Sequence, residues 1–181
     1  EVFEKMEDYK KMNLDVNTFF EMTGMIGSIC NNPEDYASFY HNYKGKRYRH
    51  DQVHNLFGYY MTRSASEAFE RYVPEKRILL FSRASYIGMH RFGGIWQGDN
   101  ASWWSHLKMN VKMMPSLNMC GFLYTGADVG GFGADCTAEL LCRWVQVGAF
   151  SPLFRNHSSN GSIYQEPWQF GEKTVDIYRK F

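Results

Sequence analysis

The sequence has few cysteines and no long apolar run. Its 181 residues include four cysteines, and no two of them are spaced as C-x-x-C. So few cysteines do not predict a disulfide framework; localisation stays open, with the reducing cytoplasm favoured. Cys120 and Cys142 lie in apolar runs, which predicts small buried residues rather than nucleophiles. No stretch of 18 apolar residues occurs, so no membrane span is expected.

The chain also lacks a dominant charge and the common cofactor motifs. A formal net charge of +1 gives no reason to expect nucleic acid or an anionic membrane as a partner. The basic segment KGKRYRH (44–50) is short, so a solvated loop is favoured over a phosphate site. GADVGGFG (126–133) has neither G-x-G-x-x-G nor a P-loop lysine, which argues against a nucleotide. No cofactor is predicted.

Three histidines raise the question of a metal. His41, His50 and His54 have the spacing H-x8-H-x3-H, and the last two could share a helix face. No H-E-x-x-H motif occurs and no cysteine joins them, so no metal site is predicted.

Hydrophobic periodicity predicts helices over residues 1–12, 54–72, 102–119, 137–150 and 172–181. The second should end before Pro74, because the residue before a proline disfavours helical geometry. Pro115 lies near the end of the third, and Thr137 is a candidate N-cap of the fourth. Residues 24–52 are predicted to be a long irregular segment with a short helical turn near residue 33.

Four apolar strands are predicted over residues 77–85, 93–100, 120–131 and 150–159. Continuous apolar strands that alternate with helices are typical of an α/β fold with a parallel sheet. In such a sheet the carboxyl ends of the strands share one edge, which is the active-site face in a β/α barrel. The strands finish on four ionisable residues, which should therefore converge: Arg83, Asp99, Asp128 and His157.

Each of these residues also has a plain structural interpretation. Asp99, in WQGDN, could cap the following helix, and Asp128 could be a turn residue among glycines. Arg83 could form a salt bridge or clamp a carboxylate through two hydrogen bonds. His157 could be structural or could bind a sugar hydroxyl.

The aromatic residues near the strand ends are open to two interpretations as well. They are most simply core residues, yet aromatic faces stack on sugars while carboxylates take the hydroxyls, so acids and aromatics together fit a carbohydrate pocket. The residues concerned are Trp96, Trp103, Trp104 and Phe132.

Three segments of the chain carry a family resemblance: LLFSRASYIGMHRFGGIWQGDN, CGFLYTGADVGGFG and LCRWVQVGAFSPLFRNHS. Together they resemble glycoside hydrolase family 31, the retaining α-glucosidases. The first half of the chain looks like bacterial members, and the resemblance extends to about residue 170. It implies a (β/α)8 TIM barrel, of which residues 1–181 would be a fragment with about strands five to eight and no internal domain boundary.

The resemblance also implies roles for individual residues. Asp99 matches the general acid/base, and Arg83 matches a pocket arginine beside the catalytic carboxylates. Asp128 and His157 match ligands of the sugar hydroxyls. The positions that match the pocket wall or its supports are Trp96, Phe132 and Arg155.

One departure from the family pattern concerns the nucleophile. The family has an aspartate in a W-x-D-M-N-E strand, and no such motif occurs here. The chain is therefore expected to be inactive alone and to need the remaining barrel half and flanking β domains.

The expected activity is exo-hydrolysis of α-linked gluco-oligosaccharides with retention, at an undetermined linkage. The alternatives are another α-glycoside such as an α-xyloside, cleavage by elimination, or a non-catalytic barrel that binds sugar or a partner.

Overall fold

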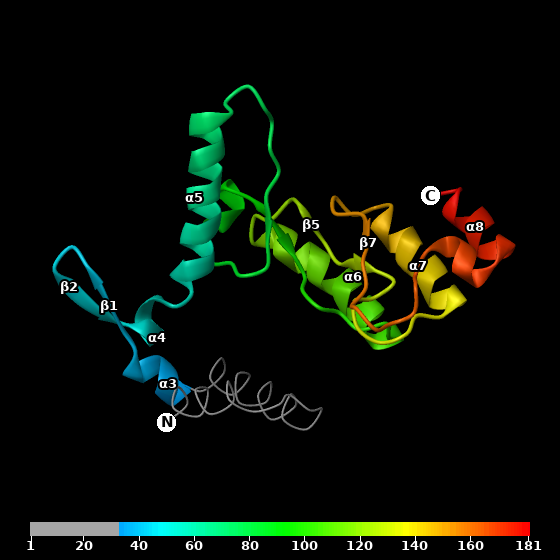
Figure 1. Cartoon of the computed structure of the whole chain (residues 1–181), viewed down its shortest axis with the longest axis horizontal. Coiled ribbons are helices and arrows are strands. Elements are labelled where there is room, and N and C mark those ends of the chain that lie inside the picture. The colour runs from blue at the N-terminus through cyan, green and yellow to red at the C-terminus, as the bar shows by residue number, and fades with distance from the viewer. Residues whose placement is uncertain (1–32) are drawn as a thin grey trace, which may run out of the picture. The chain divides into compact units, whose positions relative to one another are not determined.

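The computed structural model describes residues 33–181, and the chain divides into two compact units, residues 1–54 and 55–181. Figure 1 labels several helices and strands of each unit. The helix predicted over residues 1–12 and Cys30 lie outside the described residues. No helix within residues 33–181 is both long enough and apolar enough to cross a membrane. A single barrel domain without an internal boundary stays a prediction.

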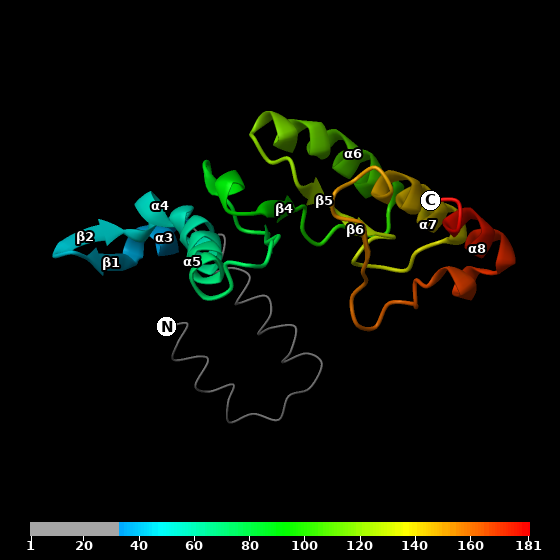
Figure 2. The ribbon, with the colours of Figure 1, turned by 90° about the horizontal axis from the view of Figure 1, so that it is seen from above.

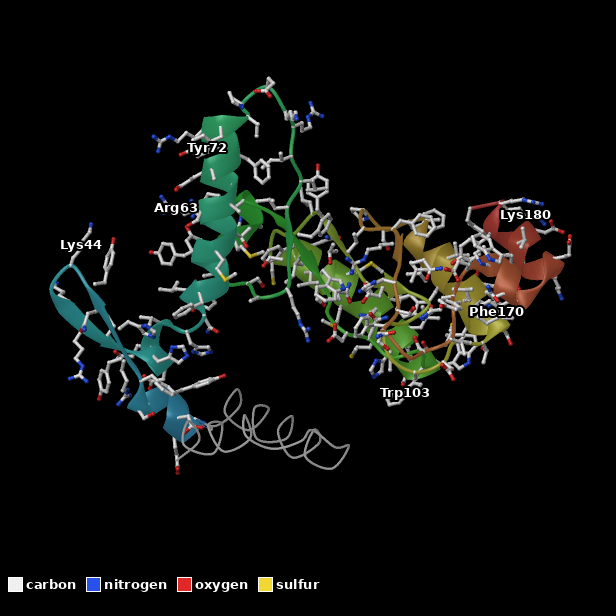
Figure 3. The ribbon with its side chains drawn as sticks, viewed as in Figure 1. Lys44, Arg63, Tyr72, Trp103, Phe170 and Lys180 are labelled. Atoms are coloured by element: carbon white, nitrogen blue, oxygen red, sulfur yellow. The ribbon has the colours of Figure 1, made fainter. Side chains whose placement is uncertain are left out.

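The described part of the first unit is a short helix, a hairpin and a helical turn. Helix α3 (Pro33–Ser38) precedes strands β1 (Tyr40–Tyr43) and β2 (Lys46–Arg49), and α4 (His50–Val53) follows. The strands pair antiparallel around Lys44 and Gly45, whose φ angles of 48° and 74° suit a two-residue hairpin turn. Lys44 lies at the tip of the hairpin (Figure 3).

The irregular segment predicted over residues 24–52 is therefore wrong for residues 40–52, which form the hairpin and most of α4, although the helical turn near Pro33 is confirmed. The cause is the side-chain pattern: β1 and β2 carry polar and aromatic residues on both faces, and none of them is fully buried. Such strands lack the alternation of apolar and polar residues on which the strand prediction depends.

The second unit begins with α5 (Leu56–Tyr72), which ends before Pro74 as predicted. Its third residue, Gly58, lies against the Ala84 backbone, where a Cβ atom would come within 2.3 Å of the carbonyl oxygen. The glycine therefore lets α5 approach the segment that follows β3 (Phe81–Ser82) closely.

Two small parallel sheets follow α5. β3, β4 (Gly94–Trp96) and β5 (Thr125–Gly126) form one sheet with β4 in the middle, and β6 (Asp128–Val129) pairs with β7 (Arg155–Asn156). The predicted parallel arrangement is confirmed. The strands are shorter than predicted, because only a few residues of each apolar run form a hydrogen-bonded ladder.

Helices cover these strands. α6 (Trp104–Met119) packs against β5, and α7 (Ala138–Gly148) packs against β6 (Figure 2). Thr137 caps α7 as predicted, its hydroxyl accepting a hydrogen bond from Leu140 N at 3.3 Å. Pro115 lies inside α6, four residues before its end. A 3₁₀ helix, η1 (Met89–Arg91), precedes β4, and η2 (Pro167–Phe170) leads into α8 (Glu172–Tyr178).

The core of the second unit lies where α7 meets β6. Its buried members are Leu107, Ala127, Val129, Cys136, Leu140, Leu141, Trp144 and Val145. Cys142 is buried as predicted, but Cys120 is exposed at the end of α6, so the prediction for Cys120 is wrong. Trp103 and Trp104, 55% and 51% exposed at the start of α6, are not core residues either (Figure 3 labels Trp103).

Candidate active site

Asp99 lies three residues beyond β4, in the turn after Trp96. Gly98, in this turn, has a φ of +85°, a backbone conformation that residues with a side chain rarely adopt. The Asp99 carboxylate accepts one hydrogen bond from Arg83 at 3.1 Å, and the two side chains are 41% and 58% exposed. The N-cap of α6 is Trp103, so Asp99 does not cap that helix. Its carboxylate is open to solvent.

Asp128, the first residue of β6, is completely buried. Its Oδ1 atom accepts hydrogen bonds from Trp96 Nε1 at 3.0 Å and Arg155 Nη2 at 2.6 Å. Its Oδ2 atom is buried too, with no hydrogen-bond partner in the described part of the chain. The carbonyl also closes a turn to Gly131 N at 3.1 Å. Because no part of this carboxylate is exposed, a sugar hydroxyl reaches it only if a covering group moves.

The surroundings of Asp128 act on its protonation in opposite directions. Burial raises the pKa of this carboxyl, because desolvation disfavours the charged form. The Arg155 guanidinium, the charge of His157 and the hydrogen bond from Trp96 each act to lower the pKa, and burial outweighs them. The carboxyl therefore holds its proton to a higher pH than an ordinary aspartate.

Trp96 joins the two arginine–aspartate pairs. The guanidinium groups of Arg83 and Arg155 each lie 5.4 Å from the centre of its ring system, within the range of a cation–π contact. Its indole N–H is committed to Asp128. One aromatic side chain from β4 thus touches the polar ends of β3, β6 and β7.

Phe132 and His157 form the other side of this cluster. Their ring centroids are 5.1 Å apart with planes inclined by 34°, and both side chains are half-buried. The Phe132 carbonyl accepts a hydrogen bond from Ser159 N at 2.7 Å, which ties the segment after β6 to the segment after β7. The structure therefore brings together residues from all four predicted strand ends, whose roles stay predictions.

Asn100 belongs to the same cluster but received no role from sequence reasoning. It is 3% exposed, and its side-chain amide donates to the Asp128 carbonyl at 3.0 Å and accepts from the Asp128 N–H at 3.2 Å. Its position directly after Asp99, in the motif WQGDN, is the sequence feature that could have indicated a role.

The three histidines of the first unit lie close together. His41 Nε2 and His50 Nδ1 are 2.8 Å apart, and the His50 and His54 rings are 5.8 Å apart. Burial, and the charges of the other two histidines, lower the pKa of His50. No group of three or more metal-ligating side chains suited to a metal ion occurs among residues 33–181.

An apolar hollow of about 460 Å³ lies between α6 and α7. It holds no carboxylate, so it offers no acid chemistry. Its lining is Trp104, Leu107, Val111, Met114, Arg143, Gln146, Val147 and Phe150.

Comparison with known proteins gives one family. The model of the "Glycosyl hydrolases family 31 TIM-barrel domain" matches residues 4–181. Alpha-glucosidase 2 of Bacillus thermoamyloliquefaciens is 41% identical over 141 residues, which are 78% of this chain and 18% of that protein. Neutral alpha-glucosidase AB of Dictyostelium discoideum is 43% identical over 74% of this chain and 14% of its own length.

Solved structures agree with the sequence matches. A family 31 α-glucosidase of Bacteroides thetaiotaomicron superposes with a TM-score of 0.68 at 37% identity, over 77% of this chain and 24% of that one. A family 31 dextranase of Flavobacterium johnsoniae, complexed with glucose, gives 0.74 at 30% identity over 83% and 19%. The chain thus spans less than a quarter of the length of each relative, and it belongs to the TIM-barrel domain of glycoside hydrolase family 31.

Proposed function

We propose that the complete protein is a retaining, exo-acting α-glucosidase that hydrolyses α-linked gluco-oligosaccharides, with Asp99 as its general acid/base. The observation that carries this proposal is the exposed Asp99 carboxylate at the end of β4, paired with Arg83 beside the face of Trp96. A carboxylate that exchanges protons with a substrate oxygen must be reachable, and Asp99 is the more exposed of the two strand-end aspartates.

The surrounding residues form the sugar site in this proposal. Trp96 and Phe132 provide aromatic faces for the apolar side of a sugar ring, and His157 binds a hydroxyl. The remaining polar members of the site are Arg83, Asp128 and Arg155, which lie against Trp96 or hydrogen-bond to it.

Retention needs a second carboxylate, which the proposal places elsewhere. A retaining glycosidase uses two carboxyl groups about 5 Å apart, one that attacks the sugar and one that donates a proton. We assign this chain about strands five to eight of the barrel, and the nucleophile to the other half. This chain alone would then be inactive, and flanking β domains would complete the protein. Its share of the relatives' lengths supports this assignment.

The test is turnover by the complete protein and its Asp99→Ala variant. We expect the variant to lose roughly 10²- to 10⁴-fold in kcat/KM on isomaltose, the usual contribution of general acid–base catalysis. The loss of kcat/KM should be much smaller on p-nitrophenyl α-glucoside, because this constant reports the first step and p-nitrophenolate leaves without a proton. Equal losses on both substrates would contradict the acid role. If the complete protein contains the nucleophile strand but turns over neither substrate, another α-glycoside is favoured as the substrate. If it has no nucleophile and no activity, a binding protein is favoured.

A further inference from the structure

We infer that Asn100 is a positioning residue that holds the Asp99 carboxylate in place by standing in for a missing segment of β-ladder. The inference rests on the proposed acid/base role of Asp99 and extends it to a residue to which no role is assigned. Asn100 has no exposed surface for a substrate to touch, since it is 3% exposed.

The ladder between β4 and β5 stops just before Asp99. Ile95 N donates to the Tyr124 carbonyl at 2.9 Å and Gln97 N to the Gly126 carbonyl at 3.0 Å, as in a regular parallel pair. Asn100 N then donates to the Gly98 carbonyl at 2.9 Å. A hydrogen bond between residues two apart closes a three-residue turn, and Asp99 is its apex. The chain thus leaves the sheet for these residues and presents Asp99 to solvent.

The side chain of Asn100 connects the chain after the Asp99 turn to the main chain of Asp128, the first residue of β6. Its amide makes the two hydrogen bonds with the Asp128 main chain that a paired peptide group would make. The main-chain carbonyl of Asn100 accepts hydrogen bonds from Phe132 N at 2.6 Å and Gly133 N at 3.2 Å. Ser102 N then donates to the Gly133 carbonyl at 2.7 Å. Asn100 therefore fixes the C-terminal end of the Asp99 turn, through its side chain to the backbone of Asp128 and through its main chain to the backbone of Phe132.

Loss of this amide should loosen the turn that presents Asp99, because Asn100 directly follows Asp99 in the chain. A displacement of about 1 Å in a catalytic group costs on the order of 100-fold in rate. The effect should appear only where the acid is needed, because a good leaving group departs unprotonated. We therefore expect Asn100→Ala in the complete protein to lower kcat/KM on isomaltose roughly 10- to 100-fold. The loss of kcat/KM on p-nitrophenyl α-glucoside should be about threefold or less.

Asn118→Ala is the matched control. Asn118 also tethers a loop through its side-chain amide, which donates to the Phe122 carbonyl at 2.6 Å, and this hydrogen bond involves no residue of the site. It should leave the turnover of both substrates unchanged. If Asn100→Ala does not fold, Asn100→Ser keeps one polar group at the site and should show the same selective loss.

The outcomes separate this inference from the proposed function. A folded Asn100 variant with normal turnover, or with equal losses on both substrates, overturns the positioning role while Asp99→Ala still shows a selective loss. If Asp99→Ala shows no selective loss, the proposed function and this inference fail together. A selective loss in both variants supports both.

Discussion

The two arginine–aspartate pairs that lie against Trp96 have the same chemistry but differ in burial. Arg83 and Asp99 lie 3.1 Å apart, and both are largely exposed. Arg155 and Asp128 lie 2.6 Å apart, and Asp128 is fully buried. Each arginine also lies over a face of Trp96. Burial rather than distance distinguishes the pairs: the Asp99 carboxylate can meet a substrate, whereas the Asp128 carboxylate is already held by Trp96 and Arg155.

Burial also decides what each pair contributes to stability. An exposed ion pair contributes about 0–1 kcal/mol, since water and salt screen it and two long side chains lose freedom. Removal of one partner from a buried pair costs about 3–5 kcal/mol, because it leaves an uncompensated charge. Arg155 is itself 45% exposed, which favours the lower end of that range. The Arg155–Asp128 pair should therefore contribute more to the stability of the fold than the Arg83–Asp99 pair.

Replacement of each arginine in turn should give the largest difference in stability between the two pairs. We expect Arg155→Met to lower the free energy of unfolding of the complete protein by roughly 3 kcal/mol, because Asp128 stays buried without its cation. Arg83→Met is the matched control and should cost less than about 1 kcal/mol. Urea unfolding followed by tryptophan fluorescence measures both. Equal costs would show that the two pairs do not differ as their burial indicates.

The pH dependence of stability tests the burial of Asp128 separately from that of its partner. Its pKa in the folded state is raised above the ordinary value of 3.8 by burial. The folded protein therefore binds this proton over a range of pH above 3.8 in which the unfolded chain has lost it, so stability falls as pH rises through that range. Relative to Asp128→Asn, which cannot titrate, the wild type should lose stability upward from about pH 4 and then level off above the folded pKa.

The measurement is the difference in unfolding free energy between wild type and Asp128→Asn at several pH values from 4 to 7. Titrating groups that do not interact with Asp128 are common to both proteins and cancel. The charge of His157 acts on Asp128, so both proteins are compared in a His157→Gln background. A difference that moved in favour of the wild type as pH rose would mean that Arg155, rather than burial, dominates the protonation of Asp128.

The sequence predicts correctly those features that depend on residues close together in the chain. The end of α5 before Pro74 and the cap of α7 by Thr137 depend on residues that are neighbours in sequence. The parallel pairing also followed, because apolar runs that alternate with helices allow few other arrangements. Lys44 and Gly45 were available as a turn signal, but the polar strands beside them gave no periodicity to support a hairpin.

The remaining errors concern burial, which depends on distant partners. Leu79 and Leu123 are apolar and were predicted to lie in strands, yet both lie outside the ladder and are exposed. Cys120, Trp103 and Trp104 are exposed for the same reason: composition does not say which apolar faces meet. Asn100 was missed because its side-chain amide pairs with a backbone 28 residues away.

The smallest expected effect is the direct coupling within the exposed pair. A double-mutant cycle of Arg83→Met and Asp99→Asn should give a coupling energy of a few tenths of a kcal/mol, because both side chains face solvent. At about 1 M salt, where the screening length is about 3 Å, this coupling should vanish. The cycle of Arg155→Met and Asp128→Asn should keep most of its larger coupling, since salt does not reach a buried carboxylate. If salt weakened both couplings alike, Asp128 would be as accessible to solvent as Asp99, and burial could not be what distinguishes the two pairs.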